Sequence, residues 1–148
     1  MTKNVLITVK GVQQDDAGEM SSSETVVHGE YFFKNGSHYI FYEETSEDSS
    51  EKVKNSLKLK GNMLELTRKG AVDSRMVFET DKRHTANYAT PFGTLRMETV
   101  TSRILLLEEE EHIQFKVEYD LWANEAFLSK CMLTINLEPI WGTVTSKV

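Results

Sequence analysis

The sequence predicts an all-β protein, in which one small antiparallel meander closes into a barrel of about eight to ten strands. Apolar and polar residues alternate along most of the chain from Lys3 to Pro139, and a period of two is typical of strands. No segment carries an apolar stripe of helical spacing. Because a long meander exposes two sheet edges and closure removes both, a barrel is the expected arrangement.

Length and composition favour one domain over residues 1–148. A chain of 148 residues that is 39% hydrophobic suits a single core. Its one cysteine, Cys131, has no partner for an internal disulfide, and the N-terminus lacks the apolar run of a signal peptide, which favours a cytoplasmic location. No stretch approaches the roughly 20 apolar residues that span a bilayer, so no membrane partner is expected.

The net charge of −6 is unevenly distributed along the chain. Between Lys52 and His84 there are nine basic residues against four acidic ones, so this part carries +5 and the rest −11. A basic stripe is one way to bind an anionic partner. We favour a surface on which basic strands neighbour acidic ones, and no nucleic-acid partner is expected, because the pI is about 5.3.

Turn residues divide the chain into ten predicted strands. The strongest turn signal is Asn35-Gly36, a pair that adopts the positive φ angles of a two-residue hairpin turn. The four glutamates of residues 108–111 and the pair Asn124-Glu125 are further predicted turns, and residues 14–22 are expected to form a polar connection. The predicted strands cover residues 5–13, 23–34, 37–45, 52–60, 63–69, 74–80, 84–90, 94–107, 112–123 and 126–138.

Five short segments spread along the chain carry a resemblance to a known family. They are NVLITVKG at residues 4–11, YIFYEE at 39–44, LELTRKG at 64–70, PFGTL at 91–95 and VEYDL at 117–121. Taken together they resemble the YwiB-like family of uncharacterised bacterial proteins. The resemblance covers nearly the whole chain and implies a calycin-like barrel, in the same class as the lipocalins. It implies no activity, because the family has none assigned.

The residues that face the inside of a barrel indicate what it can hold. On the strand that begins at Thr94, one face carries Leu95, Met97, Thr99, Thr101 and Arg103. If this face points inward throughout, the planar guanidinium of Arg103 suits the carboxylate or phosphate of a ligand. The alternative is a bulge near Ser102, which would send Arg103 to the outer face.

The next two predicted strands add three polar or polarisable side chains to the same interior. Tyr119 is an inward aromatic residue with a polar tip, and it either binds a ligand or finds a backbone partner. Ser129 either lines a cavity or is a small residue that admits a large neighbour. Cys131 is expected to be buried and inert. The predicted ligand-binding residues are therefore Arg103, Thr99, Thr101, Tyr119 and Ser129.

The sequence predicts no catalytic centre, metal site or cofactor. The four histidines show no pair at metal-ligand spacing, and one cysteine cannot build a thiolate site. There is no glycine-rich phosphate loop and no Gly-x-Ser-x-Gly turn. Enzymatic function has no positive support.

The hairpin from Val26 to Tyr42 is apolar on both faces, so its outer face is expected to be covered. Either the segment Ile140-Trp141 lies over it or a second copy of the chain does, in a homodimer. For function we hypothesise a cytoplasmic barrel that binds a small anionic or amphipathic ligand in its interior. The alternative is a protein-interaction or structural module whose barrel is filled by side chains and holds no ligand.

Overall fold

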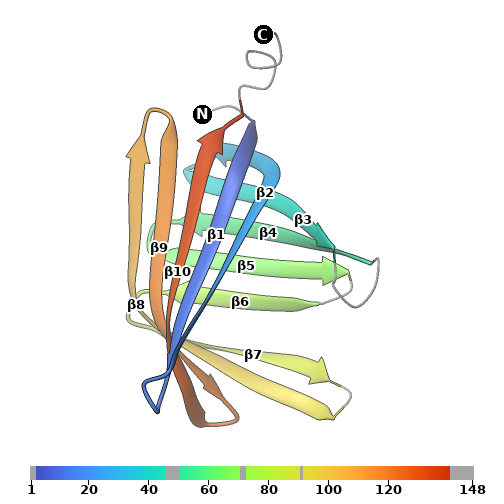
Figure 1. The fold of residues 1–148 in the computed structure, drawn as a ribbon, viewed down its shortest axis with the longest axis vertical. Helices are drawn as coiled ribbons and strands as arrows, with labels where there is room; N and C mark the ends of the chain where they lie inside the picture. The colour runs from blue at the N-terminus through green and yellow to red at the C-terminus, as the bar shows by residue number, and fades with distance from the viewer. Residues whose placement is uncertain (1–2, 46–50, 71–72, 91, 141–148) are drawn as a thin grey trace.

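The computed structural model describes residues 3–45, 51–70, 73–90 and 92–140. These residues form ten strands in a single sheet and no helix (Figure 1). The strands are β1 Asn4–Asp15, β2 Met20–Lys34, β3 Ser37–Thr45, β4 Lys52–Lys60, β5 Met63–Gly70, β6 Ser74–Glu79, β7 Arg83–Thr90, β8 Gly93–Glu109, β9 His112–Ala123 and β10 Ala126–Pro139. All ladder pairs are antiparallel, as predicted, and the sheet curls into a nearly closed barrel.

The sheet order is β6-β5-β4-β3-β2-β1-β10-β9-β8-β7. Strands that follow one another in the chain are neighbours in the sheet, except β6 and β7, and the first strand pairs with the last. In that pair, β1 and β10 run side by side from Val5 opposite Pro139 to Asp15 opposite Ser129. The two edge strands, β6 and β7, are therefore the ones that a complete barrel would have to join.

Two-residue turns set the register of the hairpins, as the sequence predicts. Asn35 and Gly36 have φ angles of 53° and 78°, and Asn124 and Glu125 have φ angles of 48° and 70°. The tight turn at Asn35 pairs Phe33 with His38. It thereby decides which residues of β3 face the barrel interior, because a slip of one residue would reverse every side chain.

The expected polar connection over residues 14–22 is wrong. Strand β1 continues to Asp15, β2 begins at Met20, and only a short turn separates them. The Asp15 carboxylate accepts hydrogen bonds from the backbone N–H groups of Ala17 and Glu19, at 3.0 and 2.8 Å, and closes this turn. Polar residues are tolerated in these strand ends because their side chains are exposed there.

The core of the barrel is filled by apolar side chains from the inward face of the strands. Nearly every strand contributes at least one of them, which makes a single continuous cluster. Its fully buried members include Ile7, Ile40, Leu57, Leu64, Phe78, Phe115, Ile135 and Leu137. Burial of these side chains is the main favourable term in folding.

Two irregularities change the face on which side chains point. The register of β8 against β9 shifts between Thr101 and Arg103, and that of β10 against β9 shifts between Phe127 and Ser129. Each shift is a bulge, so residues on its two sides no longer follow one alternation. Among the described residues there is no helix that is long and apolar enough to cross a bilayer.

The outer face of the β2–β3 hairpin carries partly exposed aromatic residues. Phe32 and Phe41 keep 39% and 38% of their surface exposed, and their rings meet edge to face with centroids 6.0 Å apart. Tyr42 points inward instead. Ile140 is tied to β1 by a hydrogen bond from its N–H to the Asn4 carbonyl, at 3.2 Å. The proposed cover by Trp141 lies outside the described residues.

Candidate functional site

The barrel is open along one seam, where β6 faces β7 and β8. In the described part of the chain no ladder joins β6 to β7, and a single parallel bridge links Thr80 to Thr101. Backbone hydrogen bonds cross there from Asp81 to Thr101 and from Thr101 to Lys82, at 2.8 and 3.3 Å. Beyond this corner the facing edges carry backbone groups that no neighbouring strand pairs.

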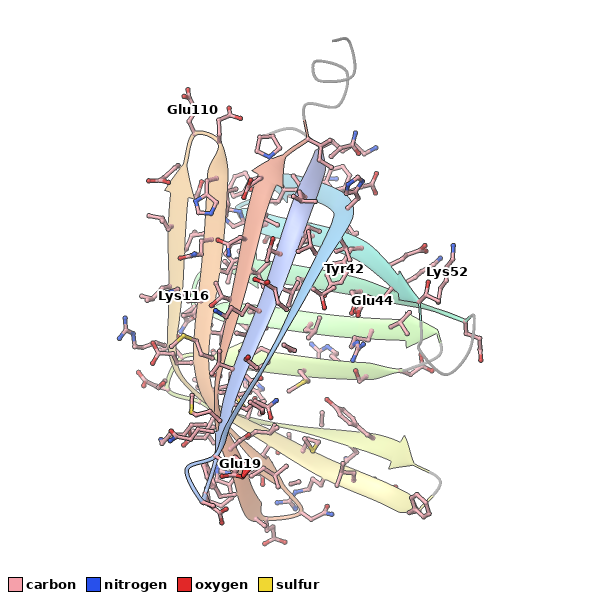
Figure 2. All side chains as sticks on the ribbon, viewed as in Figure 1. Glu19, Tyr42, Glu44, Lys52, Glu110 and Lys116 are labelled. Carbon is pink, nitrogen blue, oxygen red and sulfur yellow. The ribbon has the colours of Figure 1, made fainter. Side chains whose placement is uncertain are left out.

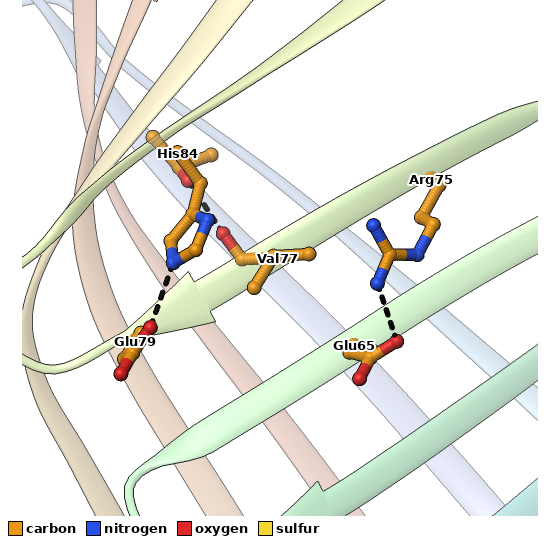
Figure 3. Close-up of polar contacts among 6 residues, drawn as sticks. Glu65, Arg75, Val77, Glu79 and His84 are labelled. Atoms are coloured by element: carbon orange, nitrogen blue, oxygen red, sulfur yellow. Dashed lines mark hydrogen bonds and ion pairs between the residues drawn. The ribbon is translucent and has the colours of Figure 1, made fainter.

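Side-chain contacts link the two edges where the backbone pairing stops. The Thr99 hydroxyl donates a hydrogen bond of 2.7 Å to the Val77 carbonyl on β6. His84 Nε2 lies 2.8 Å from the Glu79 carboxylate, which ties β7 to the end of β6 (Figure 3). These contacts hold the two edges near each other without closing the gap between them.

A cavity of about 280 Å³ lies at this seam. Its apolar part includes Met76 and Met97, two flexible side chains that adapt to irregular shapes. Its polar part comes from both edges, with Arg75 on β6 and Thr85 and Asn87 on β7. The remaining lining residues are Val77, His84, Ala86 and Thr99. Small-molecule sites combine apolar contacts with placed polar groups, and this lining has both kinds, with polar residues in the majority.

Arg75 is held at the rim by an ion pair with Glu65 on β5, at 2.9 Å (Figure 3). The pair is largely exposed on the arginine side, so it contributes little to stability. The guanidinium has five N–H donors, and the contact with Glu65 leaves others available. Arg75 is therefore able to contact an anionic group at the cavity mouth while remaining bound to Glu65.

Three of the predicted ligand-binding residues are buried on the neighbouring strands β8, β9 and β10. Thr101 and Tyr119 are opposite each other on β8 and β9, and Tyr119 is opposite Cys131 on β10. The Ser129 hydroxyl lies 3.3 Å from the Cys131 sulfur. Burial raises the pKa of Tyr119, and the neighbouring thiol of Cys131 raises it further. A neutral tyrosine hydroxyl is therefore maintained across the ordinary pH range.

Thr101 has the most unusual environment in this group. Its side chain is 1% exposed, and its hydroxyl oxygen has no hydrogen-bond partner among the described residues. A buried hydroxyl without a partner costs free energy, on the order of 1–3 kcal/mol. Thr99, by contrast, is satisfied by Val77 and lines the seam cavity.

The inward placement of Arg103 is wrong, and the bulge alternative is the one that the structure has. The register shift after Thr101 places Arg103 opposite Glu118 on the outer face. Its guanidinium forms an ion pair with that carboxylate at 3.6 Å, and its side chain is 58% exposed. Ile104 takes the next inward position, so the apolar run that follows could satisfy the core only with a bulge.

An inward arginine does exist, on a different strand. Arg68 shares its face of β5 with Leu64 and Leu66, and its Nε donates to the amide oxygen of Asn55 at 3.2 Å. The amide nitrogen of Asn55 donates in turn to Glu44 at 2.8 Å. The signal was present in the sequence, because Leu64, Leu66 and Arg68 have the same parity.

A second polar group that the sequence reasoning missed lies at the other end of the barrel. The hydroxyl of Tyr31 is 2.7 Å from His38 Nδ1, and His38 Nε2 is 3.6 Å from Glu108. Burial raises the pKa of Tyr31 to about 12, with a further contribution from Glu108, so the phenol keeps its proton. The tight turn at Asn35 could have revealed this placement, because it puts His38 on the face of Ile40.

Neither polar group forms a recognisable reaction centre. Within the described ranges, no three histidine, cysteine, aspartate or glutamate residues converge as metal ligands. The hydroxyl of Tyr31 is made less acidic by its surroundings, which is the opposite of what activates a nucleophile.

The comparisons with known proteins agree with this fold and name no activity. The chain is 31% identical over 121 residues to the uncharacterized beta-barrel protein YwiB of Bacillus subtilis strain 168, an alignment that covers 82% of this chain and 83% of that protein. It is also similar to the crystal structure of the ywiB protein from Bacillus subtilis, with a TM-score of 0.80, 28% identity and coverage of 93% and 92% of the two chains. The predicted resemblance is thus confirmed. Residues 7–135 match the model of a domain of unknown function, DUF1934, and the chain belongs to that family.

Proposed function

We propose that this protein binds a small molecule in the seam cavity between β6 and β7. The observation that carries the proposal is the cavity itself, which lies where the sheet fails to close. Its volume of about 280 Å³ is near the lower end of ligand sites, which run from roughly 300 to 1,000 Å³. The ligand class is therefore a compact molecule rather than a long lipid.

The lining indicates an amphipathic ligand with a polar or anionic end. Met76 and Met97 would contact its apolar part, and Asn87 and Arg75 would contact its polar part at the rim. Thr99 is the residue from the sequence-predicted set that lines this cavity. Thr101 and Tyr119 lie deeper, and Arg103 has no part in the proposal because it lies outside the barrel.

The proposal is tested by recording amide ¹H–¹⁵N spectra of the protein with a library of compact amphipathic compounds. We expect the compounds that bind to shift the amides of residues 75–77, 84–87 and 97–99. The variant Thr85→Trp places a large ring at the rim from an exposed position, and should lose these shifts. Thr25→Trp, at an exposed position on β2, is the matched control. Shifts that are equal in both variants, or spread over other strands, would refute the site.

A homodimer through the β2–β3 hairpin is a second proposal, supported by the partly exposed rings of Phe32 and Phe41. Exposed aromatic pairs on an outer sheet face are typical of interfaces. Phe32→Glu with Phe41→Glu should turn a dimer into a soluble monomer in light scattering. A wild-type protein that is monomeric at high concentration contradicts the dimer but leaves the seam proposal unaffected.

A further inference from the structure

A large hollow lies on the outside of the barrel. It spans β2 to β5 and has a volume of about 730 Å³. Most of its lining side chains belong to the outward face of the strands, as their register shows, whereas Gly29, Tyr42 and Asn55 belong to the inward face. We call it the outer groove, and its key residues are His28, Phe41, Lys54, Ser56, Thr67 and Lys69.

A close approach of two strands shapes one wall of the outer groove. Gly29 lines it, opposite Tyr42 on β3. A Cβ atom at Gly29 would overlap the Ile7 side chain and the Phe41 carbonyl oxygen. Only glycine fits at this position.

The charges in the outer groove are unevenly matched. Both carboxylates that line it form ion pairs with lysines outside the lining, Glu30 with Lys3 at 3.5 Å and Glu43 with Lys52 at 3.8 Å. Lys54 and Lys69 lie directly opposite each other on β4 and β5. The described residues supply neither of them with an ion pair, although Glu43 lies opposite Lys54 on β3.

Two ammonium groups on directly opposed positions repel each other, which destabilises the sheet unless something compensates. An anion between them would remove this repulsion and form charge-assisted hydrogen bonds with both. The adjoining row places Ser56 opposite Thr67, so two hydroxyl groups stand next to the paired lysines. Phe41 is opposite Ser56 on the other side and offers the face or edge of a ring.

We propose that the outer groove is a second binding site, which takes an organic anion that carries a flat apolar ring. Lys54 and Lys69 contact the carboxylate, sulfonate or phosphate of the ligand. Ser56 and Thr67 donate hydrogen bonds to it, and its ring packs on Phe41. The site lies on the opposite side of the sheet from the core and shares no lining residue with the seam cavity, so it does not depend on the seam proposal. It shares Phe41 with the proposed dimer face, so a dimer formed there would compete with the ligand.

The test uses the dye 8-anilinonaphthalene-1-sulfonate, whose fluorescence rises on transfer from water to an apolar surface. We expect saturable binding that weakens with salt, because screening reduces charge attraction. Lys54→Met with Lys69→Met should raise the Kd roughly tenfold, the change that about 1.4 kcal/mol produces. The uncharged analogue N-phenyl-1-naphthylamine should bind wild type and this variant within about twofold, since its ring contact does not involve charge.

The matched control is Lys10→Met with Lys116→Met, which removes two exposed or half-exposed charges from the outer faces of β1 and β9. Figure 2 shows Lys116 well away from the ends of β3 and β4, where Glu44 and Lys52 lie. This control should leave the dye Kd within about twofold of wild type, and melting curves establish that every variant is folded. An equal loss of dye binding in both double variants would mean that the dye responds to the net charge of the protein, which would refute the proposed site in the outer groove.

The position of the dye is read from amide shifts. Shifts of residues 28–30, 41–43, 54–56, 67 and 69 support the outer groove. Shifts confined to residues 75–77 and 84–87 would place the dye in the seam cavity, which overturns the groove while supporting the proposed function. The absence of saturable binding up to millimolar dye would also refute the proposed site in the outer groove. It would not bear on the seam cavity, which is tested separately.

Discussion

The Thr99 hydroxyl lies 2.7 Å from the Val77 carbonyl and bridges the only part of the described sheet where a backbone ladder is missing between facing strands. Elsewhere, each ladder is a series of backbone bonds between neighbouring strands. Here the facing strands are held by the Thr99–Val77 hydrogen bond, the His84–Glu79 contact and the backbone hydrogen bonds at Thr101. Because few bonds need to break, the seam is expected to be the region of the barrel that opens most readily.

We expect the substitution Thr99→Val to weaken the seam without altering the core. Valine has the same shape but cannot donate to Val77, so a buried carbonyl is left unpaired at a cost of about 1–3 kcal/mol. Urea unfolding should show this loss, and hydrogen exchange should accelerate at β6 and β7 first. Thr8→Val, at a half-buried position on β1, is the control. Unchanged exchange along β6 in Thr99→Val would contradict the role of this bond.

The buried His38 should make stability depend on pH. Burial lowers its pKa below the ordinary value of 6.5, although Glu108 acts in the opposite direction. The unfolded chain therefore takes up this proton at a higher pH than the folded chain does. The free energy of unfolding should fall as pH drops below about 6.5, until the folded-state pKa is passed.

This dependence is measured by urea midpoints at pH 7.5 and 5.5. In His38→Gln the decrease between the two pH values should be smaller than in wild type, because the variant has no imidazole to protonate. His28→Gln, which alters an exposed histidine on β2, should keep the wild-type decrease. A decrease of the same size in wild type and His38→Gln would assign the pH effect to other groups.

The two arginines on opposite faces of the sheet should differ sharply in their importance. Arg103→Met removes an exposed ion pair with Glu118 and should change stability by less than about 0.5 kcal/mol. Arg68→Met deprives the buried amide of Asn55 of a donor and should cost about 1–3 kcal/mol. Chemical unfolding of the two variants compares them directly, and a larger effect for Arg103→Met would mean that the assigned faces are reversed.

The sequence was informative about strands because local patterning decides them. The alternation of β4, for example, places Leu57 and Leu59 inside and the lysines outside, and the structure agrees. The pair Asn35-Gly36 likewise defines a hairpin by its own φ preferences. These features depend on residues that are close in the chain, so a single sequence contains them.

The candidate site was harder to predict because it depends on long-range geometry. Thr99 and Val77 are 22 residues apart, and their contact arises from how far the barrel fails to close. The bulge that turns Arg103 outward was one of two alternatives, and only the packing of Ile104 into the core decides between them. Arg68 and His38 were accessible through parity but were overlooked, since charged residues are usually assigned to the outer face.

The central claim is that the seam cavity holds a small molecule, and native mass spectrometry of protein taken from one cell extract tests it most directly. We expect wild type and the control Thr25→Trp to carry the same additional mass. Thr85→Trp, with its cavity mouth obstructed, should lack that mass while keeping its folded charge-state distribution. An identical bound species in all three proteins, or no bound species in wild type, would contradict the claim.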